Sequence, residues 1–314
     1  MNMNTKLERD RLDSLMASVK RNSLRGKVAV VAGATRGAGR AIAVTLGAAG
    51  ATVYCTGRSV RGNPSDLQRS ETIEDTAELV TACGGQGIPV RTDHTLEEEV
   101  KALFERVSAE QEGRLDILVN DLWGGEHLTE WGVPFWESSL AKGLLMQERA
   151  VKGHMITSYY GAPLMTAKQS GLILEVTDGV SYNYRGNLYY SLAKISPIHL
   201  AAAMNEELRP YHVTALAVTP GFLRSEQMLE YFGVEEGNWQ DAIAQEPHYA
   251  ESETPYFLAQ GIAELAADPQ VAAKAQEGRV WSSWSLSDEY GYRDIDGRKP
   301  HWGNYAEAQG LPVN

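Results

Sequence analysis

Short apolar runs alternate with amphipathic stretches along most of the chain, at the spacing of strands followed by helices. The run at 27–32 (KVAVVA) is rich in β-branched residues and is followed by glycine, so it predicts a buried strand. Further strands are expected at 51–56, 87–91, 115–120, 172–177 and 213–219, with a short last strand at 280–283. Helices are expected at 39–49, 71–82, 96–112 and 190–209, and helical residues lead up to Lys168.

This alternation indicates the fold class. Strands and helices in turn predict a parallel sheet that is covered by helices on both faces. Right-handed crossovers make it a doubly wound, three-layer α/β/α sheet of Rossmann type. Because no linker, repeat or low-complexity tract interrupts the pattern, we expect a single domain at 24–285. An N-terminal extension at 1–23 and a C-terminal tail at 286–314 would flank it.

Charge and hydropathy narrow the range of partners. The 314-residue chain has a formal net charge of -12, whereas binding to nucleic acid needs clustered Lys and Arg. The longest strongly apolar stretches run to about ten residues, against roughly 20 for a bilayer span, and the amino end lacks the apolar core of a signal peptide. We therefore expect a cytoplasmic protein without nucleic-acid or membrane partners. Cys55 and Cys83 are expected to be reduced thiols, with a redox pair as the alternative.

A glycine-rich turn joins the first predicted strand to its helix. It reads Gly33-Ala34-Thr35-Arg36-Gly37-Ala38-Gly39. Free backbone N–H groups and a helix N-terminus in this position favour an anionic group such as the diphosphate of a dinucleotide. Gly33 would permit the tight turn, Gly37 the approach of the diphosphate, and Gly39 close packing of helix on strand. A turn that is glycine-rich without binding anything is the alternative, and the strand–helix context favours binding.

The end of the second strand indicates which nucleotide is bound. An acidic residue there holds the ribose 2′-OH of NAD, whereas arginine accommodates the 2′-phosphate of NADP. This strand ends in Gly57-Arg58-Ser59 with no acid nearby, and Arg36 of the glycine turn is expected to reach the same phosphate. Two guanidiniums can bind one phosphate through charge-assisted hydrogen bonds. The sequence therefore predicts NADP(H) as the cofactor, with two solvated surface arginines as the alternative.

Tyr190 and Lys194 stand four residues apart in the helix that follows the fifth strand, so they share one helix face. A phenol ordinarily keeps its proton to about pH 10. A nearby ammonium and a positively charged nicotinamide would lower its pKa and make it an acid and a base near neutral pH. Such pairs are also common on exposed helix surfaces. Here their place in the strand order favours a catalytic pair.

With these motifs the chain resembles the short-chain dehydrogenase/reductase family, in its compact single-domain branch, over roughly residues 24–267. Besides the glycine turn and the Tyr190 to Lys194 motif, the resemblance rests on residues that follow or end the third, fourth and sixth strands. These are Asp93, Asn120 and the pair Pro220-Gly221.

The resemblance implies a role for each of these residues. Asp93 would hydrogen-bond the adenine, and Asn120 would steady the central strand beside the ribose. Lys194 would hold the nicotinamide ribose, and Pro220-Gly221 would lie beside the carboxamide. Oligomers are common in the family, so a homo-oligomer, either a dimer or a tetramer, is also expected.

Two departures from the family pattern lie before the fifth strand. Family members usually have Asn-Asn-Ala-Gly after the fourth strand, where this chain has Asn120-Asp121-Leu122-Trp123. They also usually carry an Asn of a proton relay in the next helix. Its place is taken by Ala150, so no relay residue is assigned.

A third departure concerns the serine that orients the substrate at the end of the fifth strand. Asp178 stands at or next to its place. A protonated Asp178 would donate a hydrogen bond to a carbonyl oxygen, and an ionised one would pair with a basic nitrogen or a hydroxyl. In the alternative, Asp178 is only part of a turn and Thr177 or Ser181 supplies the hydroxyl.

The segments 123–136, 182–189 and 222–256 are rich in aromatic residues and suit a small, flat or apolar substrate, although most of these residues are expected to pack the insertions down. The aromatic residues from 281 to 302 belong to a subunit contact or to the core. No histidine shows metal-ligand spacing, so no metal is expected.

The leading hypothesis is an NADP(H)-dependent oxidoreductase that moves a hydride between nicotinamide and a carbonyl or alcohol, with Tyr190 as general acid/base. An imine reductase and a catalytically silent NADP-binding regulator are the alternatives.

Overall fold

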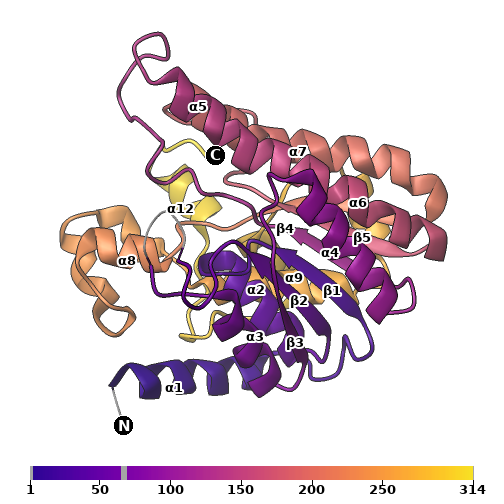
Figure 1. The fold of residues 1–314 in the computed structure, drawn as a ribbon. Helices are drawn as coiled ribbons and strands as arrows, with labels where there is room; N and C mark the ends of the chain where they lie inside the picture. The colour runs from indigo at the N-terminus through magenta and orange to yellow at the C-terminus, as the bar shows by residue number, and fades with distance from the viewer. Residues whose placement is uncertain (1–2, 65–68, 314) are drawn as a thin grey trace.

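The computed structural model describes residues 3–64 and 69–313, with side chains from residue 11 onward. Seven parallel strands form one sheet in the order β3-β2-β1-β4-β5-β6-β7, and helices cover both of its faces (Figure 1). The predicted doubly wound α/β fold is therefore confirmed. The strands are β1 (Val28–Ala32), β2 (Thr52–Gly57), β3 (Gln86–Arg91), β4 (Ile117–Asn120), β5 (Gly171–Val176), β6 (Val213–Thr219) and β7 (Trp281–Ser282).

The helices that cover the sheet follow the strands in sequence. Just before β5, the helical run contains one π-helical turn at Glu148–Lys152. The α-helices are α1 (Met3–Ser18), α2 (Gly37–Ala48), α3 (Ile73–Ala82), α4 (Glu97–Glu110), α5 (Leu140–Gln147), α6 (Gly153–Lys168), α7 (Leu188–Leu208), α8 (Glu226–Phe232), α9 (Pro255–Ala267), α10 (Val271–Gln276), α11 (Ser283–Tyr290) and α12 (Trp302–Ala308).

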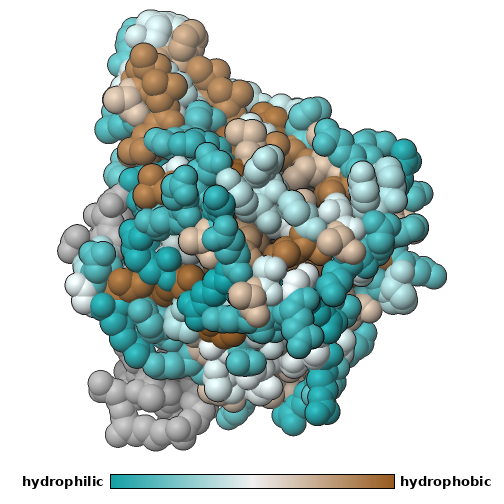
Figure 2. All heavy atoms as spheres, turned by 45° about the vertical axis from the view of Figure 1, so that its right-hand side comes forward, coloured by the Kyte–Doolittle hydropathy of each residue, from teal (hydrophilic) through white to brown (hydrophobic). Residues whose placement is uncertain are grey.

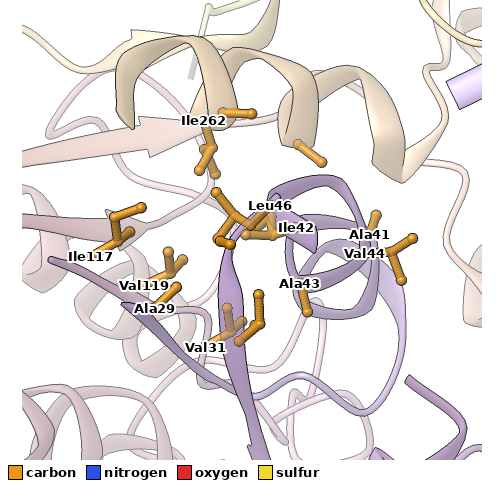
Figure 3. Packing of buried hydrophobic residues seen from close by; sticks show 14 of the residues in the cluster. Ala29, Val31, Ala41, Ile42, Ala43, Val44, Leu46, Ile117, Val119 and Ile262 are labelled. Atoms are coloured by element: carbon orange, nitrogen blue, oxygen red, sulfur yellow. The ribbon is translucent and has the colours of Figure 1, made fainter. Parts of the chain in front are cut away.

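Alternate residues of the buried strands face opposite sides of the sheet, as the pleat of a strand requires. In β1, Ala29 and Val31 pack on the side of α2 and α9, whereas Val28 and Val30 pack on the side of α4 and α6. Figure 3 shows the first of these layers, in which small residues of α2 let the helix lie close to the sheet. A sheet that is buried on both faces explains why its strands appear in the sequence as continuous apolar runs.

Described segments near both termini pack on this body. Leu15 of α1 is fully buried in the larger core cluster, so the N-terminal extension is docked on the sheet domain. The helix α11 runs across the predicted boundary at residue 285, and the segment after it returns to the sheet domain. Cys55 and Cys83 are free and buried. Within the described residues, no helix is at once long and apolar enough to cross a membrane.

The loops at the carboxyl ends of the strands carry the residues of interest. A long loop, residues 121–139, follows β4 and leads into α5, which protrudes at one end of the molecule (Figure 1). In parallel sheets, ligands bind at this edge, beside the point where the strand order reverses. Here that point lies between β1 and β4.

Candidate active site

A cavity of about 880 Å³ lies at the carboxyl edge of the sheet. Its volume is near the upper end of the about 300–1,000 Å³ found for ligand sites. Of the predicted site residues, only Gly39 and Asn120 are absent from its wall. The others line it: Gly33, Thr35, Arg36, Gly37, Arg58, Ser59, Asp93, Asp178, Tyr190, Lys194, Pro220 and Gly221.

The glycine turn leaves no room for side chains at two of its positions. A Cβ on Gly33 would lie 2.3 Å from the carbonyl oxygen of Asp121, and one on Gly39 would lie 2.2 Å from the carbonyl oxygen of Gly33. Gly39 therefore acts through close packing behind the cavity wall. The amide of Gly37 donates a hydrogen bond of 2.9 Å to the carboxylate of Glu226, so the turn already holds one anionic oxygen. This geometry fits a diphosphate at the same amide.

Arginine side chains gather at the next part of the cavity. Arg58 extends toward the loop after β4. Its Nη2 atom lies 3.7 Å from the position that a Cβ on Gly124 would take. Arg36 lies 3.7 Å from a carboxylate oxygen of Glu126. The carboxylate of Asp93 accepts hydrogen bonds from its neighbour Thr95. Burial alone would raise the pKa of Asp93, but these hydrogen bonds and the charge of Arg58 lower it.

Asn120 lies behind the cavity in a buried polar network. Its side-chain amide donates to Ser158 Oγ at 2.9 Å and to Glu175 Oε1 at 2.7 Å. The other oxygen of Glu175 is hydrogen-bonded to Nδ1 of His154, whose Nε2 atom lies 3.1 Å from the carbonyl oxygen of Leu122. The network joins β4, β5 and α6 under the site, since each of these elements supplies a member.

The hydroxyl of Tyr190 donates a hydrogen bond of 2.5 Å to the carboxylate of Asp178. Burial and then the negative charge of Asp178 raise the pKa of Tyr190 well above its ordinary value. The sequence analysis expected a lowered pKa for Tyr190, whereas the residues of the chain raise it. The phenol ring is held between Trp123 and Trp131, at centroid distances of 5.5 and 5.1 Å.

Lys194 reaches an indole ring. Its ammonium lies 3.9 Å from the ring centroid of Trp123 and 5.7 Å from that of Tyr190. Burial lowers the pKa of Lys194, while the charges of Asp178 and Asp121 act in the opposite direction. Asp121 itself has a pKa raised to about 7 by burial, against the charge of Lys194. The ammonium thus lies among carboxyl groups and an aromatic face.

Of the three candidates for the serine position, Asp178 is the one that accepts the hydrogen bond of the phenol. Thr177 donates its hydroxyl to the carbonyl of Lys194, and Ser181 accepts a hydrogen bond from the amide of Asn183. Ala150 is buried in the π-helical turn before α6. A π-turn of this kind often marks a functional site.

Arg185 is a site residue that the sequence reasoning missed. Its guanidinium is buried and donates to the carbonyl oxygens of Asp178, Ser181 and Asn183 at 2.6, 2.7 and 2.8 Å. These bonds close the loop that holds Asp178 against the phenol. A single arginine among polar and aromatic loop residues gives no signal in the sequence, because its partners are backbone atoms.

Pro220 and Gly221 form the turn after β6. The amide of Gly221 donates to the carboxylate of Glu253 at 3.0 Å, and Ser283 donates to the same oxygen at 2.6 Å. Burial raises the pKa of Glu253 to about 8. In the part of the chain that the structure describes, no group of three or more His, Cys, Asp or Glu side chains is arranged to hold a metal ion.

Comparisons with known proteins show which family the chain belongs to. The sequence model of the short chain dehydrogenase family matches residues 27–233. The human protein "Dehydrogenase/reductase SDR family member 1" is 35% identical over 278 residues, which cover 88% of this chain and 85% of that protein.

Solved structures share the fold. A short chain dehydrogenase from Mycobacterium thermoresistibile superposes with a TM-score of 0.72 at 23% identity, over 93% of this chain and 95% of the other. A 7α-hydroxysteroid dehydrogenase, solved in complex with NADH and 7-oxo glycochenodeoxycholic acid, gives a TM-score of 0.67 at 23% identity, over 91% and 98%. From its sequence match and its fold, the chain belongs to the short-chain dehydrogenase/reductase family of oxidoreductases, which bind a nicotinamide cofactor.

Proposed function

We propose that this protein is an NADP(H)-dependent oxidoreductase that transfers a hydride between nicotinamide and a carbonyl or alcohol. One observation carries the proposal. The hydroxyl of Tyr190, oriented by Asp178, lines the same cavity as the glycine turn and the arginines Arg36 and Arg58. Hydride transfer to a carbonyl requires an oriented acid and a binding site for the cofactor in one cavity. Tyr190 would be the acid, and the glycine turn would bind the anionic cofactor.

The wall of the cavity suits the cofactor. The amide of Gly37 would hold the diphosphate, and Arg36 and Arg58 would hold the 2′-phosphate. Asp93 would accept from the adenine, and Lys194 would bind the nicotinamide ribose. When bound, the nicotinamide supplies or accepts the hydride.

Tyr190 acts in this proposal as the proton donor for reduction. Because Asp178 disfavours the phenolate, the phenol keeps its proton over a wide pH range and is ready to protonate a developing alkoxide. The carboxylate accepts the phenolic hydrogen bond until the substrate oxygen takes its place. Arg185 holds the loop of Asp178, so the direction of the phenol is set before the substrate arrives.

The carboxylate of Asp178 also favours a second substrate class. A neutral serine at this place can donate to a carbonyl, whereas a carboxylate stabilises a positively charged iminium carbon–nitrogen bond. Reduction of an iminium needs a hydride and no proton from Tyr190. Turnover of a cyclic imine that depends on Asp178 and not on Tyr190 would favour this class.

A substrate screen with Tyr190→Phe tests the proposed function. NADPH oxidation is followed with ketones, aldehydes and cyclic imines. For a carbonyl substrate we expect kcat to fall about 100-fold or more in Tyr190→Phe, since general acid catalysis contributes about 10²–10⁴-fold. The Kd for NADPH should change little, and Tyr211→Phe, an exposed residue, serves as the control. Tight NADPH binding without turnover of any compound would identify a regulator instead.

Cofactor choice is tested by Arg58→Asp. A charge-assisted hydrogen bond contributes about 1.5–3 kcal/mol, so the Kd for NADPH should rise about 10- to 100-fold. The Kd for NADH should change much less, because NADH carries no 2′-phosphate. Arg209→Asp, at an exposed arginine that follows α7, is the control. Equal weakening of both nucleotides, measured by fluorescence titration, contradicts the assignment of Arg58.

The pH profile of reduction tests the contact between Asp178 and Tyr190. The phenol must be protonated to act as the acid, so the rate falls as pH rises through its pKa. Asp178→Asn removes the negative charge that raises this pKa, so the alkaline fall should move to lower pH. The measurement is kcat against pH at saturating NADPH, with the exposed Asp241→Asn as the control. An alkaline limb at the same pH in Asp178→Asn rules out this role.

We also propose a homo-oligomer, either a dimer or a tetramer. Large apolar side chains are exposed on α5 and on the segment before it, and Figure 2 shows hydrophobic colour at this protruding end. They include Phe135, Trp136, Leu140 and Leu144, whose exposed fractions are 52%, 69%, 61% and 57%. Contiguous exposed apolar residues are typical of protein–protein contacts. The cytoplasmic location stays a prediction from the sequence.

Sedimentation of the double variant Leu140→Glu with Leu144→Glu tests this surface. Two new carboxylates should dissociate the oligomer into single chains, because a buried unpaired charge is costly. Leu96→Glu, at another exposed leucine, should leave the assembly intact. A parent protein that sediments as one chain, or a double variant that stays assembled, overturns the assignment.

A further inference from the structure

The carboxyl-terminal segment supplies part of the cavity wall. Trp302 and Pro312 line the cavity together with Asp178 and Tyr190. The match to the family sequence model ends at residue 233, before this part of the wall. The sequence left the aromatic residues up to 302 open between a subunit contact and the core. In the structure, Trp302 is a half-buried wall residue.

Trp302 is placed against the turn after β6. A Cβ on Gly221 would lie 3.0 Å from the Cβ of Trp302, so the first residue of α12 touches this turn. The indole meets the ring of Phe222, another wall residue, edge to face at 5.9 Å. The ring of Tyr305 lies 5.8 Å from the indole of Trp302, and the hydroxyl of Tyr305 lies 3.1 Å from Nδ1 of His248. The indole is therefore held in one position beside the turn.

The segment that leads to α12 is anchored by buried polar contacts. Arg224, which is almost fully buried, pairs with Asp296 at 2.6 Å. The carboxylate of Asp294 accepts from the amide of Thr254 at 2.7 Å, and Arg298 donates to the carbonyl of Ala250 at 2.8 Å. Removing one partner of a buried pair is strongly destabilising. These contacts hold the carboxyl-terminal segment in one position on the domain, so the part of the cavity wall that it forms has a defined shape.

We propose that residues 294–313 are the specificity element of this enzyme, in which the indole of Trp302 limits the width of the substrate and Pro312 forms the rim. The inference rests on the proposed function. Trp131, Tyr184 and Phe222 line the same cavity, so the substrate lies among aromatic surfaces. Such a wall selects flat, apolar carbonyl compounds, in particular cyclic ketones whose ring lies against the indole.

Two ketones of different width test the proposal. The ratio of kcat/KM for the bicyclic 1-tetralone to that for cyclohexanone is measured in the parent, Trp302→Ala and Trp302→Phe. Trp302→Ala removes the indole contact with the narrow cyclohexanone ring and opens space for the wider 1-tetralone. We therefore expect the ratio to rise at least about tenfold, with a smaller rise in the same direction in Trp302→Phe. The Kd for NADPH should stay within about twofold of the parent value.

Trp302→Phe keeps an aromatic ring at the packing position, so the test holds even where Trp302→Ala fails to fold. Tyr211→Ala truncates an exposed aromatic residue just before β6 and should leave the ratio unchanged. A ratio that stays within about twofold of the parent in a folded Trp302 variant overturns the inference and leaves the proposed function standing. A parent protein that reduces no ketone with NADPH overturns both.

Discussion

Three backbone segments meet in van der Waals contact where β1 turns into α2, and this contact determines the geometry of the cavity. The Cα of Gly33 lies against the carbonyl of Asp121, and the Cα of Gly39 lies against the carbonyl of Gly33. A Cβ at either glycine would approach an oxygen to 2.3 or 2.2 Å. The turn after β1 is therefore seated directly on the end of β4. As a result, the backbone amides of the glycine turn lie at a fixed distance from the residues that follow β4 and β5.

The same contact places an unusual carboxyl group near the reacting end. Burial raises the pKa of Asp121 to about 7, while the nearby ammonium of Lys194 and the amide of Gly39 lower it. The charges of Asp178, Asp121 and Glu126 all act to raise the pKa of Lys194, against the lowering by burial. Trp123 lies 3.9 Å from the ammonium, and the pKa of Tyr190 is raised by burial and then by the charge of Asp178. A shared helix face brought Tyr190 and Lys194 into one cavity but did not determine which groups they touch.

The sequence predicted the sheet well because its physical basis is local. Strands that are buried on both faces appear in the sequence as continuous apolar runs, and a helix begins where the spacing of apolar residues changes. The expected strands therefore begin and end within two residues of the observed ones. The turn residues and the pair in α7 were found through their place after particular strands. Arg185 and Trp302 were not, because their roles arise from contacts with backbone or side chains far along the chain. The carboxylate at Asp178 was recognised, but its contact with the phenol needed the loop that Arg185 closes.

The two halves of the cavity are under different physical constraints. The half proposed to bind the cofactor is built from backbone atoms in contact, where only glycine fits at two positions, so few sequences can build it. The half proposed to face the substrate is built from side chains such as Phe222 and Trp302. Their positions depend on anchors such as the pair of Arg224 and Asp296, and a different set of side chains can fill the same space. A fixed hydride geometry with an exchangeable wall explains how one fold can keep its reaction while its substrates change.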